Sequence, residues 1–368
     1  MKNIIIFINS MSAPGGIERV VSNLLKIWSD KYRITLLVKD DAKASFYEIP
    51  ENVERVSLNE PLLLDMKNRK QRITAVWNNA LKSHKKLKNY LKSKEYDYIY
   101  TTTPLNSLEV YLANRNEKDK LVISEHASAF AVNKIYQAIK KYVYPKALCI
   151  SVPNRMDCEV YESWGCKTIY IPHLFTFSAS EKNTLDTKIA LNVGRYTADK
   201  RQADLIRIWS KIPDKNGWQL WIVGKGEEED NLRNLINELD VCDSVKLIGH
   251  TSAIADIYKQ ASLFLFSSWM EGFGMVLLEA MAFGIPCISY DCPSGPRDIV
   301  IDGYNGYLIN NDDQGVFQSA VDKAIHMSTD LIRQLGDNAF KTVQEWDNDD
   351  IADQWDKLFS MREMRNKQ

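Results

Sequence analysis

The sequence predicts an α/β protein with two doubly wound parallel sheets, and three observations lead to that fold class. Short apolar runs alternate with helical patterns along the chain, as in parallel sheets whose strands are joined by helices. The length of 368 residues exceeds what one average core organises. Between 172 and 187 the stretch PHLFTFSASEKNTLDT loses periodicity and becomes polar, which indicates a domain boundary. We therefore expect domains at 1–172 and 187–349, with 173–186 as the linker.

The expected elements follow from these patterns in chain order. In the first domain the signals predict strands at 3–8, 33–38, 97–102, 121–124, 147–151 and 167–171, and helices at 17–29, 74–93, 129–143 and 154–163. In the second domain they predict strands at 188–193, 218–223, 244–248, 262–266, 286–289 and 306–309, and helices at 201–211, 227–239, 252–260, 275–283, 313–327 and 330–345. The amphipathic tail 350–363 is expected to form a last helix that is free to pack back onto the first domain.

Charge is distributed unevenly between the two halves. Residues 1–172 contain 27 Lys and Arg against 18 Asp and Glu, and the rest of the chain contains 20 against 30. A basic first half favours an anionic partner, either a membrane surface or a phosphate-bearing substrate. A solvated helix face is the alternative. Nucleic acid is not expected, because the basic stretch 82–94 (KSHKKLKNYLKSK) has one aromatic residue and no recognised nucleic-acid motif.

Several other classes of protein are disfavoured. No apolar run approaches the roughly 20 residues of a membrane span, and the apolar part of MKNIIIFINS is too short for a signal peptide. The six cysteines lack the spacing of a zinc site, so we expect buried free thiols in a cytoplasmic protein. Asp347 and Asp349 form a D-x-D pattern, but it follows a helix and is better explained by helix capping. Neither a metal nor a cofactor is expected.

Loops that follow predicted strands contain the candidate site residues, because ligands of open parallel sheets bind beyond the carboxyl ends of the strands. In the first loop, Pro14, Gly15 and Gly16 let the backbone approach a ligand, and the next helix offers free N–H groups to an anion. A plain tight turn explains the same residues. In the second loop, His126 follows a strand in a polar context and could accept or orient a substrate hydroxyl. A structural role is the alternative.

The first loop of the second domain brings positive charge into an otherwise acidic domain. Arg195 and Lys200 lie in this loop and at the start of the next helix. An arginine binds phosphate oxygens with its two-pronged guanidinium and a lysine adds a point charge, so the pair suits a diphosphate. Arg201 is an alternative to Lys200 for this role.

Three strands of the second domain end at glycines, namely Gly194, Gly224 and Gly249. Glycine permits a tight turn and a close approach of backbone to a ligand. A structural turn is the default explanation for Gly224 and Gly249, although either can border a bound nucleotide.

The stretch SSWMEGFGMVLLEAMAFGIPCIS contains two acids, Glu271 before a turn and Glu279 inside an apolar helical run. At the mouth of this loop, Glu271 can accept hydrogen bonds from sugar hydroxyls. A carboxylate in the apolar surroundings of Glu279 is costly unless it binds a donor, which fits two vicinal hydroxyls better than a solvent-facing stripe. The helix start offers an anion the backbone N–H groups of Gly272, Phe273, Gly274 and Met275.

Together these loops resemble those of retaining glycosyltransferases of family 4, of the type that builds bacterial surface polysaccharides. The most specific part is the E-x7-E block EGFGMVLLEAMAFGIPCIS, which continues into DCPSGPRDIVIDGYNGYLI. GGIERVV near the N-terminus and VGRYTADKRQ in the second domain agree with it, so the resemblance covers nearly the whole chain. It implies the GT-B fold, in which two Rossmann-like domains face each other across a cleft.

The resemblance implies a role for each matching residue of the second domain. Glu271 would hold hydroxyls of the donor sugar, with the backbone of Gly272, Phe273 and Gly274 beside it. Glu279 would bind the ribose of the nucleotide. Arg195 and Lys200 would bind the diphosphate, and with Glu271 and His126 they form the expected catalytic set.

In the first domain, the resemblance implies that Gly15 and Gly16 lie against the donor phosphate or the acceptor. It implies that His126 lies beside the reacting sugar. Two residues depart from the family pattern: His173 stands where the Asn of an I-P-N run is common, and Lys225 occupies a turn that often carries an acid. The motif therefore does not identify the donor.

The implied reaction is a retaining transfer of a hexose or N-acetylhexosamine from a nucleotide diphosphate sugar, with UDP as the expected nucleotide. The implied acceptor is a polysaccharide or a glycan on a polyprenyl diphosphate, and family members of this kind need no metal. The basic first domain fits a peripheral position at the anionic inner face of the cell membrane. The alternative from another class is a catalytically silent nucleotide-sugar-binding scaffold. An NAD-linked oxidoreductase is more distant, because the dinucleotide fingerprint is missing.

Overall fold

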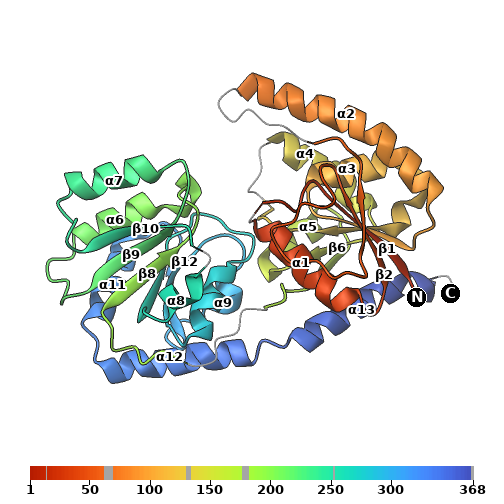
Figure 1. The fold of residues 1–368 in the computed structure, drawn as a ribbon. Coiled ribbons are helices and arrows are strands. Elements are labelled where there is room, and N and C mark those ends of the chain that lie inside the picture. The colour runs from red at the N-terminus through yellow and green to blue at the C-terminus, as the bar shows by residue number, and fades with distance from the viewer. Residues whose placement is uncertain (14, 62–68, 130–133, 176–181, 252, 366–368) are drawn as a thin grey trace. The chain divides into compact units, whose positions relative to one another are not determined.

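The computed structural model describes residues 1–13, 15–61, 69–129, 134–175, 182–251 and 253–365. The chain forms two compact units: the first contains Met1–Leu174 and Asn348–Gln368, and the second contains Phe175–Asp347. The expected linker 173–186 spans this division, and its residues 176–181 lie outside the described residues. Each unit contains one parallel sheet with helices, so the predicted α/β class is confirmed (Figure 1).

The first unit is built on a seven-stranded parallel sheet with the order β3-β2-β1-β4-β5-β6-β7. Its strands are β1 (Asn3–Ile8), β2 (Arg33–Val38), β3 (Glu54–Ser57), β4 (Tyr98–Thr101), β5 (Leu121–Ser124), β6 (Cys149–Val152) and β7 (Thr168–Tyr170). Its helices are α1 (Gly16–Trp28), α2 (Arg69–Ser93), α3 (Pro104–Ala113), α4 (Lys134–Val143), α5 (Arg155–Ser163) and α13 (Asn348–Arg365), with short 3₁₀ turns η1 (Arg115–Lys120) and η2 (Tyr144–Lys146). The central strands β4, β5 and β6 are buried along their whole length, as expected for a sheet covered on both faces.

One strand and one α-helix of this unit are not predicted from the sequence. The four residues of β3 are mostly polar and give no apolar run, since this strand lies at the edge of the sheet. Helix α3 begins with Pro104 at its first position, and the side chain of Thr103 caps it by accepting the N–H of Asn106 at 3.2 Å. A Thr-Pro helix start is a recognisable signal that the apolar pattern alone misses. Of the expected helix 129–143, residues 130–133 lie outside the described residues.

The second unit is built on a six-stranded parallel sheet with the order β10-β9-β8-β11-β12-β13. Its strands are β8 (Ile189–Val193), β9 (Gln219–Gly224), β10 (Val245–Gly249), β11 (Leu263–Phe266), β12 (Cys287–Asp291) and β13 (Gly306–Asn310). Its helices are α6 (Gln202–Ser210), α7 (Glu229–Glu238), α8 (Ile254–Tyr258), α9 (Met275–Ala282), α10 (Pro296–Ile299), α11 (Gln314–Ile325) and α12 (Thr329–Gln344), and η3 (Ala198–Lys200) is a 3₁₀ turn. Every predicted strand of this unit is present within two residues of its expected ends.

In each sheet the strand order reverses once, between β1 and β4 in the first unit and between β8 and β11 in the second. The loops that leave two such strands diverge to opposite faces of the sheet, which opens a ligand-binding crevice at their carboxyl ends. In the second unit these are the loops 194–201 and 267–274. The fold therefore brings the loop of Arg195 and Lys200 and the loop of Glu271 to one place.

The C-terminal helix α13 packs against the first unit, beside α1 and the β1–β2 part of the sheet (Figure 1). The rings of Trp355 and Phe359 lie edge-on to Trp28, with centroids 5.1 and 5.0 Å away. Lys2 donates a hydrogen bond to the carbonyl oxygen of Phe359 at 2.7 Å. The amphipathic pattern of the tail is therefore explained by burial against the N-terminal sheet.

Two further expectations concern membranes and thiols. In the part of the chain that the structure describes, no helix is both long and apolar enough to span a bilayer. All six cysteines are free, and five of them are buried. The expectation that all six are buried is wrong for Cys242, which is exposed because it lies in the short turn between α7 and β10.

Candidate functional site

Lys200 and Glu271 form an ion pair where the strand order of the second sheet reverses. The ammonium Nζ of Lys200, after β8, lies 2.5 Å from Oε1 of Glu271, after β11. The side chains are 18% and 15% exposed, so a ligand at the surface can reach both. Two hydrogen bonds hold the loops together: Ser267 Oγ donates to the Lys200 carbonyl and the Trp269 N–H donates to the Asp199 carbonyl, both at 2.8 Å. The geometry is consequently fixed by backbone as well as by charge.

Arg195 and Arg201 lie in the same loop but have different surroundings. Arg195 is exposed, and its guanidinium has no hydrogen-bond or ion-pair partner among the described residues. Arg201 has a left-handed backbone with φ of 55°, and its guanidinium contacts Asp204 and Asp312 at 2.7 Å each. With Arg201 bound to two carboxylates, Lys200 is the residue that lies beside Glu271. The contact shows which of the two lies beside Glu271, and the choice between them as the diphosphate ligand stays a prediction.

Gly194 and Gly224 approach each other closely at the ends of β8 and β9. A Cβ atom on Gly224 would overlap the carbonyl oxygen of Gly194, and one on Gly226 would overlap the backbone of Tyr196. At Gly249, in contrast, nothing lies within 4 Å of the place that a Cβ atom would take. Packing of the backbone therefore requires glycine at positions 224 and 226, independently of any ligand, whereas packing does not require glycine at position 249.

Helix α9 begins after a left-handed glycine and buries the second acid of the sequence motif. Gly274 has φ of 94° and precedes the first helical residue, Met275. Glu279, in the second turn, is only 4% exposed and accepts a hydrogen bond from the Tyr258 hydroxyl at 3.0 Å. The solvent-facing alternative for Glu279 is thus excluded. Sequence reasoning missed Tyr258, because nothing in the local pattern of α8 indicates a partner on another helix.

His126 lies in the first unit, directly beyond β5. Its ring stacks on that of His173, with centroids 5.3 Å apart and planes 16° from parallel. Neither ring nitrogen of His126 has a hydrogen-bond partner among the described residues. Burial lowers the pKa of His126 to about 3, so the imidazole is neutral near pH 7. A neutral ring can donate one hydrogen bond and accept another, which suits a sugar hydroxyl.

Gly15 and Gly16 also belong to the first unit and form the start of α1. Gly15 caps the helix without a side-chain hydrogen bond, and Gly16 is its first residue, one position earlier than predicted. A Cβ atom on Gly15 would overlap the carboxylate of Glu18, which is the end of a movable side chain, and nothing lies within 4 Å of one on Gly16. Gly16 therefore faces open space at the helix start, whereas the space beside Gly15 is taken by the Glu18 side chain.

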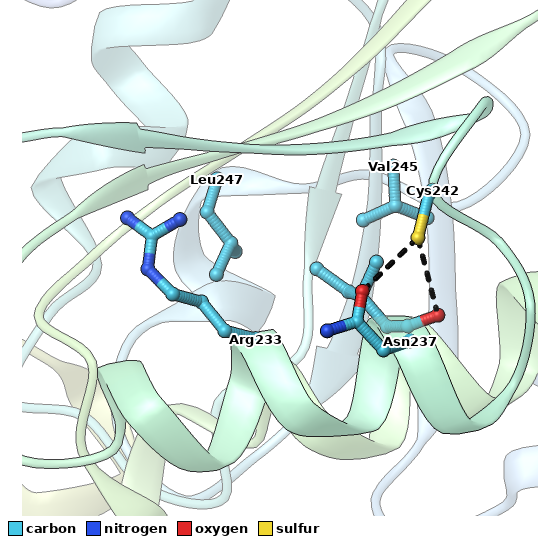
Figure 2. Close-up of a pocket in the computed structure, with 6 residues that line it drawn as sticks. Arg233, Asn237, Cys242, Val245 and Leu247 are labelled. Carbon is cyan, nitrogen blue, oxygen red and sulfur yellow. Dashed lines mark hydrogen bonds between the residues drawn. The ribbon is translucent and has the colours of Figure 1, made fainter.

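A cavity of about 230 Å³ lies elsewhere in the second unit, between α7 and the edge strand β10 (Figure 2). It is lined by Arg233, Ile236, Asn237, Cys242, Val245 and Leu247. In Figure 2 the Cys242 thiol points to Asn237, to whose side-chain oxygen it donates a hydrogen bond at 3.2 Å. None of the predicted site residues lines this cavity, and it is not part of the candidate site.

Comparison with known proteins agrees with this fold. The family model of glycosyl transferases group 1 matches residues 175–342. An uncharacterized glycosyltransferase of Haemophilus influenzae is 27% identical to this chain, over 96% of the chain and 99% of the relative. The Campylobacter jejuni N-acetylgalactosamine-N,N'-diacetylbacillosaminyl-diphospho-undecaprenol 4-alpha-N-acetylgalactosaminyltransferase is 28% identical, over 93% and 94%. A mutant of S. aureus TarM, crystallised with fondaparinux, alpha-GlcNAc-glycerol and UDP, matches with a TM-score of 0.79 at 15% identity, over 98% and 100%.

Two parallel-sheet α/β units, with candidate residues at the carboxyl ends of their strands, define a protein of the GT-B fold. The family is then given by the sequence matches. The second unit matches the glycosyl transferases group 1, and the matches together support a GT-B glycosyltransferase of the family 4 type.

Proposed function

We propose that this chain is a retaining glycosyltransferase that moves a hexose or N-acetylhexosamine from a UDP-sugar to a lipid-linked or polysaccharide acceptor in bacterial surface-glycan synthesis. The observation that carries the proposal is the Lys200–Glu271 pair at the reversal point of the second sheet. It combines a carboxylate, which accepts hydrogen bonds from sugar hydroxyls, with a cation that binds a diphosphate. UDP as the nucleotide is supported by the complex of S. aureus TarM with UDP.

Positive charge for the donor diphosphate comes from two side chains. The exposed guanidinium of Arg195 is available to phosphate oxygens. Lys200 is held by Glu271 before the donor binds, and the diphosphate then shares its ammonium group. Negative charge that develops on the leaving diphosphate therefore meets cations that are already in place, which stabilises the transition state more than the ground state.

The transfer is a front-face displacement. The bond between C1 of the sugar and the diphosphate oxygen breaks, and a bond from C1 to the acceptor oxygen forms on the same face. The acceptor proton passes to the leaving diphosphate oxygen, so no side chain has to act as general base. His126, with its neutral ring, positions sugar hydroxyls in this scheme and does not take the proton.

The proposed reaction needs no metal ion, because Arg195 and Lys200 neutralise the diphosphate. Addition of EDTA is expected to leave turnover unchanged. A loss of turnover that Mg²⁺ restores would contradict this part of the proposal while leaving the transferase activity itself supported.

The acceptor is proposed to be a glycan on a polyprenyl diphosphate, as the diphospho-undecaprenol in the name of the C. jejuni relative indicates for that protein. We place this acceptor at the inner face of the cell membrane. The first unit offers a basic surface on α2, where Leu87 and Leu91 are buried and the lysines face solvent. Five lysines are exposed in the described part of this helix; Lys86 pairs with Glu60 at 3.0 Å, and the other four are Lys82, Lys85, Lys88 and Lys92. Anionic lipid attracts such a surface by about 1 kcal/mol per basic residue near it.

Flotation of the full chain with vesicles tests the membrane part. We expect binding to vesicles that contain anionic lipid and little binding to zwitterionic ones. Replacement of the four lysines by Glu is expected to abolish the difference. Equal flotation with both kinds of vesicle would count against a membrane-bound acceptor.

The activity is tested by incubating the full chain with a panel of UDP- and GDP-hexoses and N-acetylhexosamines, and measuring the free nucleoside diphosphate. We expect one UDP-sugar to be turned over, slowly with water and faster with an added glycan acceptor. NMR of the first product then reports the anomer, and an inverted product from an α-linked donor would refute retention. Tight binding of a nucleotide sugar without turnover would favour the scaffold alternative.

A further inference from the structure

Glu125 lies between β5 and His126, and its carboxylate binds the backbone of the loop that carries the histidine. The side chain is buried. Its Oε1 accepts hydrogen bonds from the N–H groups of His126 at 3.1 Å and Ala127 at 3.3 Å. These two N–H groups lie just beyond the end of the strand, and buried N–H groups need an acceptor. One carboxylate oxygen accepts from both and so fixes the backbone of the loop.

The other oxygen of Glu125 is bound by three side chains from the helices behind the loop. Tyr161 of α5 donates to Oε2 at 2.6 Å, and Tyr144 of η2 donates at 3.1 Å. The ammonium of Lys140, on α4, lies 2.8 Å from the same oxygen and 2.8 Å from the Tyr161 hydroxyl. Burial first, and then the charge of Glu125, raise the pKa of Tyr161 far above its ordinary value, so the phenol stays a hydrogen-bond donor.

Lys140 is completely buried, which requires a physical reason. Removing an ammonium and a carboxylate from water costs several kcal/mol for each ion, and an apolar pair of similar volume is often as stable. Stability alone therefore does not explain Lys140 and Glu125. The pair does something that an apolar pair cannot do: it presents an anionic oxygen to the amides of His126 and Ala127.

A second buried ion pair in the same unit provides a comparison. Lys39 and Glu109 are also almost fully buried, and Glu109 accepts further from the hydroxyl of Ser83 at 2.7 Å. The described partners of this carboxylate are side chains, not the backbone of a loop that carries a candidate residue. The two pairs thus share burial and chemistry, and they differ in what the carboxylate holds.

We propose that Glu125 is a positioning residue, which fixes the loop of His126 and thereby the place of the imidazole beside the reacting sugar. The inference rests on the proposed function. Two restraints act on His126: the Glu125 carboxylate holds its backbone, and the stack on His173 holds its ring. A misplacement of about 1 Å of a group that orients substrate is enough to lower a rate about 10²-fold.

The first test is Glu125→Gln, assayed for glycosyl transfer with the full chain. We expect kcat to fall by about 10- to 100-fold while the KM for the donor stays within about threefold, because the donor diphosphate is bound elsewhere. Glu109→Gln is the matched control, since it neutralises the same kind of buried pair. It is expected to lose comparable stability and to keep its kcat. Equal kcat losses in both variants would overturn the inference.

A double-mutant cycle then shows whether Glu125 acts through His126. In a His126→Ala background, Glu125→Gln is expected to cause no further loss of kcat, because residues that act as a unit are not additive. Full additivity of the two losses would overturn the inference. A wild-type chain that turns over no nucleotide sugar would instead contradict the proposed function itself.

A variant without buried charges distinguishes a loss of positioning from unfolding caused by an unpaired buried ion. Glu125→Leu with Lys140→Met removes both buried ions, so that neither is left unpaired, and Glu109→Leu with Lys39→Met is its control. We expect both to remain folded and only the first to lose kcat. If the first does not fold, Tyr161→Phe replaces it. Tyr161→Phe deletes one donor to Glu125 and is expected to lower kcat less than Glu125→Gln, and an unchanged kcat would overturn the inference.

Discussion

The ammonium of Lys200 lies 2.5 Å from the carboxylate of Glu271, although 71 positions separate them in the chain. The contact exists because β8 and β11 are neighbours in the sheet, with Leu263 opposite Ala190. An ion pair between a predicted phosphate ligand and a predicted sugar ligand fixes both before any donor binds. This relationship is the basis of the first prediction.

Replacement of Lys200 by Met is expected to lower kcat/KM for the donor by about 10²- to 10³-fold, the usual loss when one preorganised donor to a developing anion is removed. Stability should change by less than about 1 kcal/mol, because the pair is partly exposed. Steady-state kinetics and thermal unfolding measure the two quantities. Arg207→Met, which removes an exposed cation of α6, is the control and should keep full activity.

Replacement of Glu279 by Gln is expected to raise the KM for the donor about tenfold with little change in kcat. The carboxylate is predicted to bind the ribose, which does not react, so its hydrogen bonds contribute equally to ground state and transition state. Tyr258→Phe removes a protein partner of the same carboxylate and should raise the KM less. An unchanged KM in Glu279→Gln would show that the carboxylate only serves the packing of α8 and α9.

Gly224 and Gly249 are both predicted to border the donor, and they respond differently to a methyl group. Gly224→Ala is expected to destabilise the second unit by about 1–3 kcal/mol or more, because the new Cβ overlaps the Gly194 carbonyl. Gly249→Ala adds a Cβ in open space and should unfold like the wild type. Urea unfolding, monitored by hydrogen exchange, reports the stability of each unit separately. Equal stability of both variants would contradict the close approach of β8 and β9.

Trp355→Ala is expected to destabilise the first unit by about 3–5 kcal/mol, since a large buried side chain is lost from the contact with Trp28. Phe46→Ala removes an exposed ring of the same unit and should cost less than about 1 kcal/mol. Hydrogen exchange in α1 and β1 reports the change. If Trp355→Ala left those amides as protected as before, the C-terminal helix would not be needed for the first unit.

His126 is expected to stay neutral down to about pH 4, because burial lowers its pKa to about 3 from an ordinary value of 6.5. The unfolded chain takes up this proton at a higher pH than the folded chain. The free energy of unfolding therefore falls as the pH is lowered from about 6.5 to about 3. His126→Asn should therefore weaken the acid dependence of stability in that window. NMR of the ring carbons gives the pKa directly, and a value near 6.5 would refute the burial of the ring.

His326 gives the opposite sign and serves as the control for the pH series. Its pKa is raised, first by its contact with the Asp322 carbonyl and then by neighbouring carboxylates. Its contribution to stability is present below pH 6.5 and is lost as the pH rises through the raised pKa. His326→Asn should consequently remove the fall in the free energy of unfolding that occurs as the pH rises above 6.5. The pH dependence of stability below pH 6.5 should stay as in the wild type.

Much of the fold follows from local patterns, as particular elements show. β11 is a four-residue apolar run and α9 a helix directly after a glycine turn, and both lie where the sequence predicts them. The polar edge strand β3 gives no such pattern, because an edge strand needs no apolar residues on both faces. The exposure of Cys242 is likewise not predicted, because the number and spacing of cysteines do not indicate which turn lies at the surface.

For the site, the sequence by itself determined which loops hold glycines, acids and cations after strands, because these are local features, and the ligand-binding role of the loops stays a prediction. Only the tertiary structure decided which of them meet. Lys200 rather than Arg201 faces Glu271, Tyr258 binds Glu279, and Lys140 lies under the loop of His126. Each of these contacts joins segments that are distant in the chain, and the packing of helices on a parallel sheet, not the local pattern, brings them within hydrogen-bond distance.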